Sequence, residues 1–214
     1  LVGGGAHAEY VVVHEATIAR IPDTLTWHEA AAIPEAFLTA YDAMITQGAM
    51  RAGDRVLVHA VASGVGLAAV QVARAWGGRA FGTSRRADKL TVARSLGMED
   101  GIALPDGPAP LVAAVKAWSE NHGADVVVDL VGGSYVGASV DAAAYRARLL
   151  LIGAVGGSDA RFDVRQALFK RSLRTALSAA SIINGPPAAN PDCSIAPAMP
   201  SVNSRTASAG FSAC

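Results

Sequence analysis

The feature that most constrains the fold is a small-residue turn that joins an apolar strand to a helix. Residues 55–78 read RVLVHAVASGVGLAAVQVARAWGG. The segment begins like a buried strand, and residues 65–76 have the apolar spacing of an amphipathic helix that ends at two glycines. A strand that turns directly into a helix is half of a βαβ unit, so this segment predicts an α/β fold.

The alternation of strand and helix continues through the centre of the chain. Further strands are predicted at 79–84, 101–104, 124–133 and 147–157, and helices at 86–96, 108–121 and 134–145. These strands are apolar almost throughout, which is typical of parallel sheets covered by helices on both faces. We therefore predict an α/β fold of the Rossmann type, with a doubly wound parallel sheet.

The regions that flank this alternation have different patterns. Residues 8–21 are β-branched and apolar with polar interruptions, and they predict one or two strands. Residues 27–50 are rich in alanine and predict two helices divided at Pro34, because proline cannot continue a helical hydrogen-bond ladder. Residues 174–214 hold few charges and no sustained apolar period, so we expect an irregular tail there.

Composition excludes several classes of function. The formal net charge is zero and no basic stripe is present, so we expect no nucleic-acid partner. No apolar run reaches the roughly 20 residues that cross a bilayer, so we expect no membrane span. The two cysteines are Cys193 and Cys214, and the five histidines lack ligand spacing, so we expect no metal site and a reducing, cytoplasmic compartment.

The turn at 60–66 has the composition of a phosphate-binding loop. Ala60, Ser63 and Gly66 occupy its three small positions, with Gly64 between the last two, and the helix follows from Val65. Small residues let the backbone approach a pyrophosphate, and the first helical N–H groups then bind the anion. The alternative is a tight corner between strand and helix with no ligand.

The end of the next strand indicates which dinucleotide would bind. An NAD site usually places a carboxylate about 20 residues beyond the glycines. This chain has Ser84, Arg85, Arg86 and Lys89 there, and these side chains would pair with a 2′-phosphate, so the pattern favours NADPH over NADH. The alternative is a solvated basic helix start.

Other positions allow both a functional and a structural interpretation. Gly132 and Gly133 would pass their backbone beside the ribose and the nicotinamide, and the hydroxyl of Thr39 would reach the same part of the cofactor. Thr39 is equally an ordinary residue of an alanine-rich helix. Residues 153–157 either line the nicotinamide pocket or form a loop without a ligand.

Three residues have side chains that could take part in catalysis, but a structural role is the better interpretation of each. Asp129 is expected to cap a turn, His59 to be a packed and hydrogen-bonded histidine, and Tyr135 to be a packing residue. No arrangement of nucleophile, base and carboxylate is apparent, so no catalytic residue is assigned.

Five ordered motifs together resemble a known family. They are GGGAHAEYVVV, AAAIPEAFLTAYDAM, AGDRVLVHAVASGVGLAAVQVARAWG, VVVDLVGGSY and LFKR. In this order they resemble the zeta-crystallin-type NADPH:quinone oxidoreductases, which are zinc-free members of the medium-chain dehydrogenase/reductase superfamily. The resemblance covers residues 3–173 approximately.

The resemblance implies both an organisation and an activity. Residues 1–36 would be the remnant of a GroES-like catalytic domain, and 37–173 the dinucleotide-binding domain. The implied reaction is hydride transfer from NADPH to a quinone or related enone in a homodimer. Two alternatives stay open: a reductase of enoyl thioesters, and a nucleotide-binding fragment without turnover.

Overall fold

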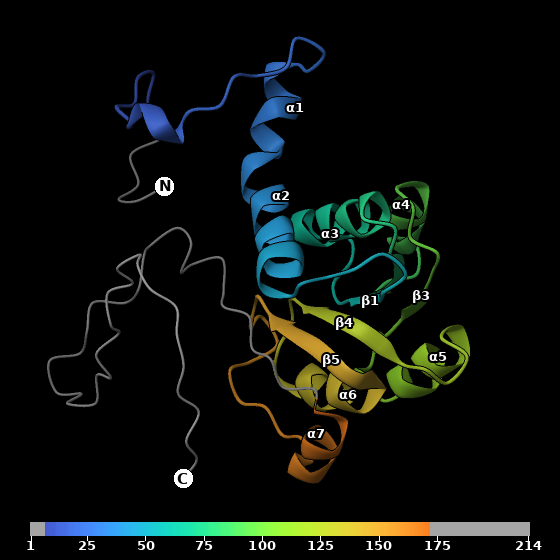
Figure 1. The fold of residues 1–214 in the computed structure, drawn as a ribbon. Helices are drawn as coiled ribbons and strands as arrows, with labels where there is room; N and C mark the ends of the chain where they lie inside the picture. Colours follow the sequence, from blue (N-terminus) through green and yellow to red (C-terminus); the bar gives the residue numbers. More distant parts are fainter. Residues whose placement is uncertain (1–6, 172–214) are drawn as a thin grey trace, which may run out of the picture.

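The described part of the chain is built around one parallel sheet. The structure is a computed structural model that describes residues 7–171 (Figure 1). Its strands are β1 (Arg55–Val58), β2 (Arg79–Ser84), β3 (Asp100–Ala103), β4 (Ala124–Asp129) and β5 (Ala143–Leu151). They form a five-stranded sheet in the order β3-β2-β1-β4-β5. The chain thus runs outward from β1 to one edge, returns to the centre and runs to the other edge, which confirms the predicted doubly wound fold.

Helices connect successive strands, and further helices precede β1 and follow β5. They are α1 (Trp27–Ala32), α2 (Pro34–Tyr41), the π-helical segment η2 (Asp42–Gln47), α3 (Gly64–Ala75), α4 (Leu90–Ser95), α5 (Leu111–Trp118), α6 (Ser134–Ala142) and α7 (Val164–Lys170). In Figure 1, α3 and α4 lie on one side of the strands, and α5, α6 and α7 lie on the other.

The strand register sends alternate side chains into two separate cores. Leu57 is aligned with Phe81 of β2 and with Val127 of β4, and all three are buried in the core shared with α5 and α6. The next residue, Val58, is aligned with Val128 and is buried in the opposite core with α2, α3 and α4. Both faces of the sheet are therefore apolar, which explains why its strands have no alternation of polar residues.

The strands predicted at 8–21 are wrong. The structure has only a short 3-10 helix there, Glu15–Thr17, and the side chains of Tyr10 and Val12 are exposed. A β-strand needs a neighbouring strand to satisfy its backbone groups, and within residues 7–171 no strand lies beside this segment. Its β-branched residues favour an extended backbone, but among the described residues the segment has no neighbouring strand with which to form a sheet.

The helices at 27–50 agree with the prediction at their boundary and differ beyond it. Pro34 begins α2 directly after α1, as expected. Thr26 and Glu29 form a capping box that fixes the start of α1. The π-helical continuation at 42–47 was not expected from the sequence. The tail predicted for 174–214 lies outside the described residues, and the domain boundaries after residues 36 and 173 stay predictions.

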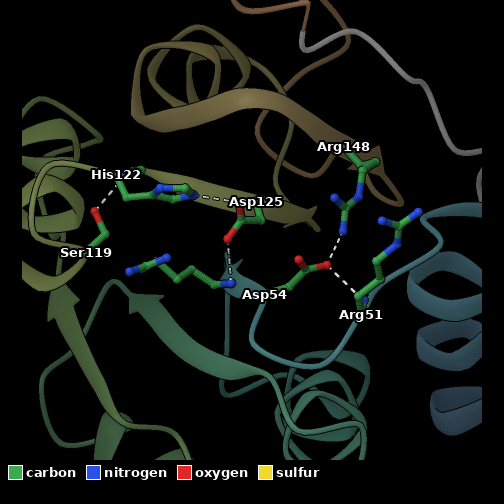
Figure 2. A network of polar contacts seen from close by, with 8 residues as sticks. Arg51, Asp54, Ser119, His122, Asp125 and Arg148 are labelled. Atoms are coloured by element: carbon green, nitrogen blue, oxygen red, sulfur yellow. Dashed lines mark hydrogen bonds and ion pairs between the residues drawn. The ribbon is translucent and has the colours of Figure 1, made fainter.

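A polar network ties the sheet together at its amino-terminal edge (Figure 2). Asp54, before β1, accepts a hydrogen bond from the backbone of Arg51 at 2.9 Å and pairs with Arg148 of β5. Asp125 of β4 accepts from the backbone of Arg55 and contacts His122, both at 2.8 Å. These side chains bind one another and the backbone at the amino-terminal ends of the strands, which is the opposite end from the usual ligand-binding position in such sheets.

Candidate functional site

A cleft crosses the carboxyl ends of all five strands. Its volume is about 790 Å³. Ser63 lines it after β1, Arg85 after β2, Pro105 after β3, Tyr135 after β4 and Gly156 after β5. Open α/β sheets bind ligands at this edge, beside the point where the strand order reverses, which here lies between β1 and β4.

The turn between β1 and α3 provides the start of a helix at the cleft. Ser63 is the N-cap of α3, and its side chain accepts a hydrogen bond from Gly66 N at 3.1 Å. The N–H groups of the first helical turn have no partners within the helix. Those of Gly64 and Val65 therefore remain as donors next to Ser63, at the positive end of a twelve-residue helix.

The glycine at position 66 is required by packing and not by contact with the cleft. A Cβ atom there would lie 2.7 Å from the carbonyl oxygens of Ala60 and Val61. The helix could then not pack as closely against the turn that follows β1. A Cβ at Gly64 would meet only Ala36, at 3.9 Å. Neither glycine lines the cleft, and their contact with a dinucleotide stays a prediction, as does that of Val65.

The predicted phosphate-binding side chains converge on the cleft. Ser84, Arg85, Arg86 and Lys89 all line it. They lie at the end of β2 and in the loop that follows, because α4 begins only at Leu90. The predicted start of this helix at residue 86 was therefore wrong. Arg85 and Arg86 precede the helix, and Lys89 is its N-cap. The loop is closed by Ser84 Oγ, which accepts from Arg86 N at 3.3 Å.

Arg86 has a partner that the sequence argument did not consider. Its Nε donates to Asp88 Oδ1 at 2.9 Å, and its Nη2 donates to Oδ2 at 2.7 Å. The hydrogen bond from Arg86 holds the pKa of Asp88 below its ordinary value, so this carboxyl is ionised at neutral pH. A carboxylate two positions after an arginine was visible in the sequence RRADK and was the signal for this pair.

The glycines after β4 shape the loops beside the cleft. The φ angles of Gly132 and Gly133 are +72° and +55°, in the left-handed region. A Cβ at Gly133 would lie 2.4 Å from Gly156 O, so the two loops touch through their backbones. The cleft itself is lined by Val131 and Gly156. Direct contact of Gly132 and Gly133 with a cofactor stays a prediction.

Asp129 has the structural role expected of it. The residue is fully buried, and its Oδ1 accepts from Val131 N at 2.8 Å and Gly132 N at 2.9 Å. It therefore fixes the turn from which the cleft-lining Val131 projects. Thr39 is buried in α2 and does not line the cleft, so its contact with a cofactor stays a prediction.

A buried histidine lies behind the cleft wall. One ring nitrogen of His59 is 3.0 Å from Thr83 Oγ1, and the other is 2.8 Å from Ser139 Oγ. Burial lowers the pKa of His59 to about 4, against a smaller opposing effect of the Asp129 charge. The ring is therefore neutral at neutral pH, which supports a packed histidine over a general base.

Two polar side chains that line the cleft, Thr83 and Tyr135, were missed as site residues. Thr83 is the partner of His59, and the ring of Tyr135 stacks edge-on against His59 with centroids 5.0 Å apart. Both also line the cleft. The position of Thr83 near the carboxyl end of β2 was the available signal for it, and the position of Tyr135 soon after β4 was the signal for that residue.

The described residues give no ligand set for a metal. Within 7–171, no group of three or more His, Cys, Asp or Glu could hold a metal ion, and both cysteines lie outside this range. No helix among these residues is long and apolar enough to cross a membrane. We assign no step to zinc.

Comparison with known proteins relates this chain to reductases. A component of the pikromycin polyketide synthase of Streptomyces venezuelae is 38% identical over 136 residues, which are 64% of this chain and 4% of that protein. The quinone oxidoreductase of Thermus thermophilus, solved also in complex with NADPH, is 35% identical with a TM-score of 0.69, over 80% of this chain and 52% of that one.

The enoyl reductase CurK is similar at 26% identity and a TM-score of 0.66, over 79% of this chain and 49% of that one. The chain thus spans about half of each of these two solved chains. A sequence model described as zinc-binding dehydrogenase matches residues 64–181, which is more than half of the chain. The chain therefore belongs to the zinc-binding dehydrogenase family, in the medium-chain dehydrogenase/reductase superfamily.

Proposed function

We propose that the cleft at the carboxyl edge binds NADPH and that the chain is the cofactor-binding part of a reductase. One observation carries the proposal. The capped start of α3 and the side chains of Arg85, Arg86 and Lys89 meet at a single cleft. A helix start suits a pyrophosphate, and a group of cations suits the additional 2′-phosphate that distinguishes NADPH from NADH.

The residues present fit this cofactor along the length of the cleft. Its apolar wall includes Leu104, Pro105 and Val155, and an adenosine or nicotinamide ring can pack against such side chains. NADPH supplies a hydride to an electron-poor carbon of the substrate, and a solvent proton completes the reduction. The chain's own residues bind and orient the dinucleotide and exclude water from part of it.

Two substrate classes have support from different relatives. Similarity to a quinone oxidoreductase supports quinones and related enones, as in zeta-crystallin-type enzymes. Similarity to a polyketide synthase component and to an enoyl reductase supports enoyl thioesters. Both are conjugated acceptors that take a hydride at an electron-poor carbon and then a proton. We place the quinone or enone first and the enoyl thioester second.

Cofactor binding is tested by calorimetry with the full chain. We expect NADPH to bind more tightly than NADH. Arg85→Ala should weaken NADPH roughly tenfold and change NADH much less, because a charged hydrogen bond to the 2′-phosphate is lost. Arg94→Ala removes an exposed arginine that does not line the cleft, and it is the matched control. Equal losses for both nucleotides in Arg85→Ala would refute the phosphate assignment.

Substrate class is tested by following NADPH oxidation with two acceptors. Phenanthrenequinone represents the quinones, and a crotonyl thioester represents the enoyl substrates. Faster turnover with one of them assigns the class. NADPH binding without turnover of either acceptor would identify a nucleotide-binding module, and the absence of binding would overturn the proposal.

A further inference from the structure

The cations around the cleft are not equivalent, and the difference bears on cofactor choice. Arg86 is held side-on by Asp88 through Nε and Nη2, at 2.9 and 2.7 Å. Within the described part of the chain, neither Arg85 nor Lys89 makes an ion pair or a side-chain hydrogen bond. Among these three residues, the cleft therefore has two cations without a carboxylate partner in residues 7–171 and one that is paired with a carboxylate.

Asp88 neutralises Arg86 without forming part of the cleft wall. Arg86 lines the cleft, whereas Asp88 does not. Both side chains are well exposed, at 68% and 61%, so their pairing is not forced by packing. Of the guanidinium, only Nη1 and the second hydrogen of Nη2 remain for another anion. A phosphate that binds to Arg86 then has the Asp88 carboxylate on the far edge of the same guanidinium.

Resting on the proposed binding of NADPH, we propose that Asp88 is a specificity-determining residue that weakens the preference of the cleft for a 2′-phosphate. It acts in two ways. It occupies one edge of Arg86, and its negative charge repels the phosphate dianion. A 2′-hydroxyl carries no charge and is not repelled, so Asp88 brings the affinities for NADPH and NADH closer together.

The test is the ratio of the dissociation constants for NADH and NADPH, measured by calorimetry on the full chain. Asp88→Asn preserves the shape of the side chain and removes its charge. We expect this ratio to rise roughly three- to tenfold at low ionic strength, which is the scale of one surface charge acting on a dianion. The gain should shrink in high salt, because exposed charges are then screened.

The matched control is Glu99→Gln. Glu99 makes the same bidentate pair with an arginine, Arg79, at the opposite end of β2. This variant removes one negative charge from a similar pair outside the cleft, and the ratio should stay as in the wild type. A rise of the same size in Glu99→Gln would show a general effect of net charge and would overturn the assignment to Asp88.

A second variant separates repulsion from positioning. Asp88→Ser removes both the charge and the side-on contact, and we expect the ratio to rise as in Asp88→Asn. A fall in either variant would show that Asp88 holds Arg86 in place for the phosphate, and an unchanged ratio would show that it has no effect. Both results overturn the inference while NADPH binding stands. If the wild type binds no NADPH, the proposed function fails, and the inference fails with it.

Discussion

At the scale of single residues, the turn before α3 shows how closely a helix packs against the backbone that leads into it. Gly66 lies where the helix passes the carbonyl groups of the turn after β1, and Gly64 lies two residues earlier, where a Cβ would make only an ordinary contact with Ala36. The two glycines share a motif but not a role. Their replacement by alanine separates packing from helix propensity.

Gly66→Ala should destabilise the fold by about 2 kcal/mol, because the new methyl group would lie 2.7 Å from two backbone oxygens that cannot move independently. Gly64→Ala, at a helical position with room for a methyl group, should be neutral or stabilising by up to about 1 kcal/mol. Urea denaturation without cofactor measures both. Equal effects of the two substitutions would contradict the packing role of Gly66.

His59 makes stability depend on pH in a defined window. Its pKa in the folded chain is about 4, below the ordinary value of 6.5, so the unfolded state binds the proton more readily. Its contribution to stability is complete above pH 6.5 and decreases as the pH falls toward 4, by about 3 kcal/mol in total. The free energy of unfolding, followed from pH 7 to pH 4, measures this loss.

The comparison variant is His59→Asn, which retains a hydrogen-bonding group beside Thr83 and does not titrate. Its stability should change less with pH across the same window. Parallel curves for the wild type and the variant would show that other groups cause the pH dependence.

At the scale of elements, the amino-terminal edge network fixes the strand β5 to the loop before β1. Arg148 Nε donates to Gly48 O at 2.8 Å, and the same guanidinium pairs with Asp54. The Arg148 and Asp54 side chains are only 18% and 15% exposed, so their partners cannot easily turn to water. This pair therefore contributes more than the surface pairs elsewhere in the structure.

Arg148→Met should lower the free energy of unfolding by about 2 kcal/mol, since it leaves the Asp54 carboxylate and Gly48 O without their partner. Arg94→Met breaks an exposed pair with Asp100 and should cost less than about 1 kcal/mol. Guanidinium chloride would screen these charges, so urea is the suitable denaturant. A larger loss in Arg94→Met would contradict this ranking.

Helices and strands could be predicted from the sequence where one local feature, such as an apolar run or a proline, determines the backbone structure. The apolar runs of β1, β2 and β4 reflect burial on both faces, and Pro34 marks a boundary that backbone chemistry enforces. The segment 8–21 could not be predicted, because strand formation depends on a partner and local composition does not supply one. Ser63 and Arg85, whose positions follow from motif spacing, line the cleft, whereas the pairing of Asp88 with Arg86 was not predicted.

At the scale of the whole molecule, the described N-terminal segment lies apart from both cores. Residues 7–20 contain no buried side chain, and Figure 1 shows this segment leading away from α1. Limited digestion with trypsin should therefore cleave after the exposed Arg20 before it cleaves after Arg79 or Arg148 in the sheet, because local opening is least costly where few contacts exist. Mass spectrometry of the first fragments checks the order. Resistance at Arg20 would show that the segment is covered in solution.

The amino-terminal and carboxyl-terminal ends of the strands have separate roles. Arg148 and Asp54 hold the strands at one edge, and the loops that line the cleft leave from the other. Mutations that alter the lining of the cleft can therefore accumulate at the carboxyl ends of the strands without destabilising the sheet. Such independence makes a framework of this kind easy to diversify, by natural selection or in the laboratory.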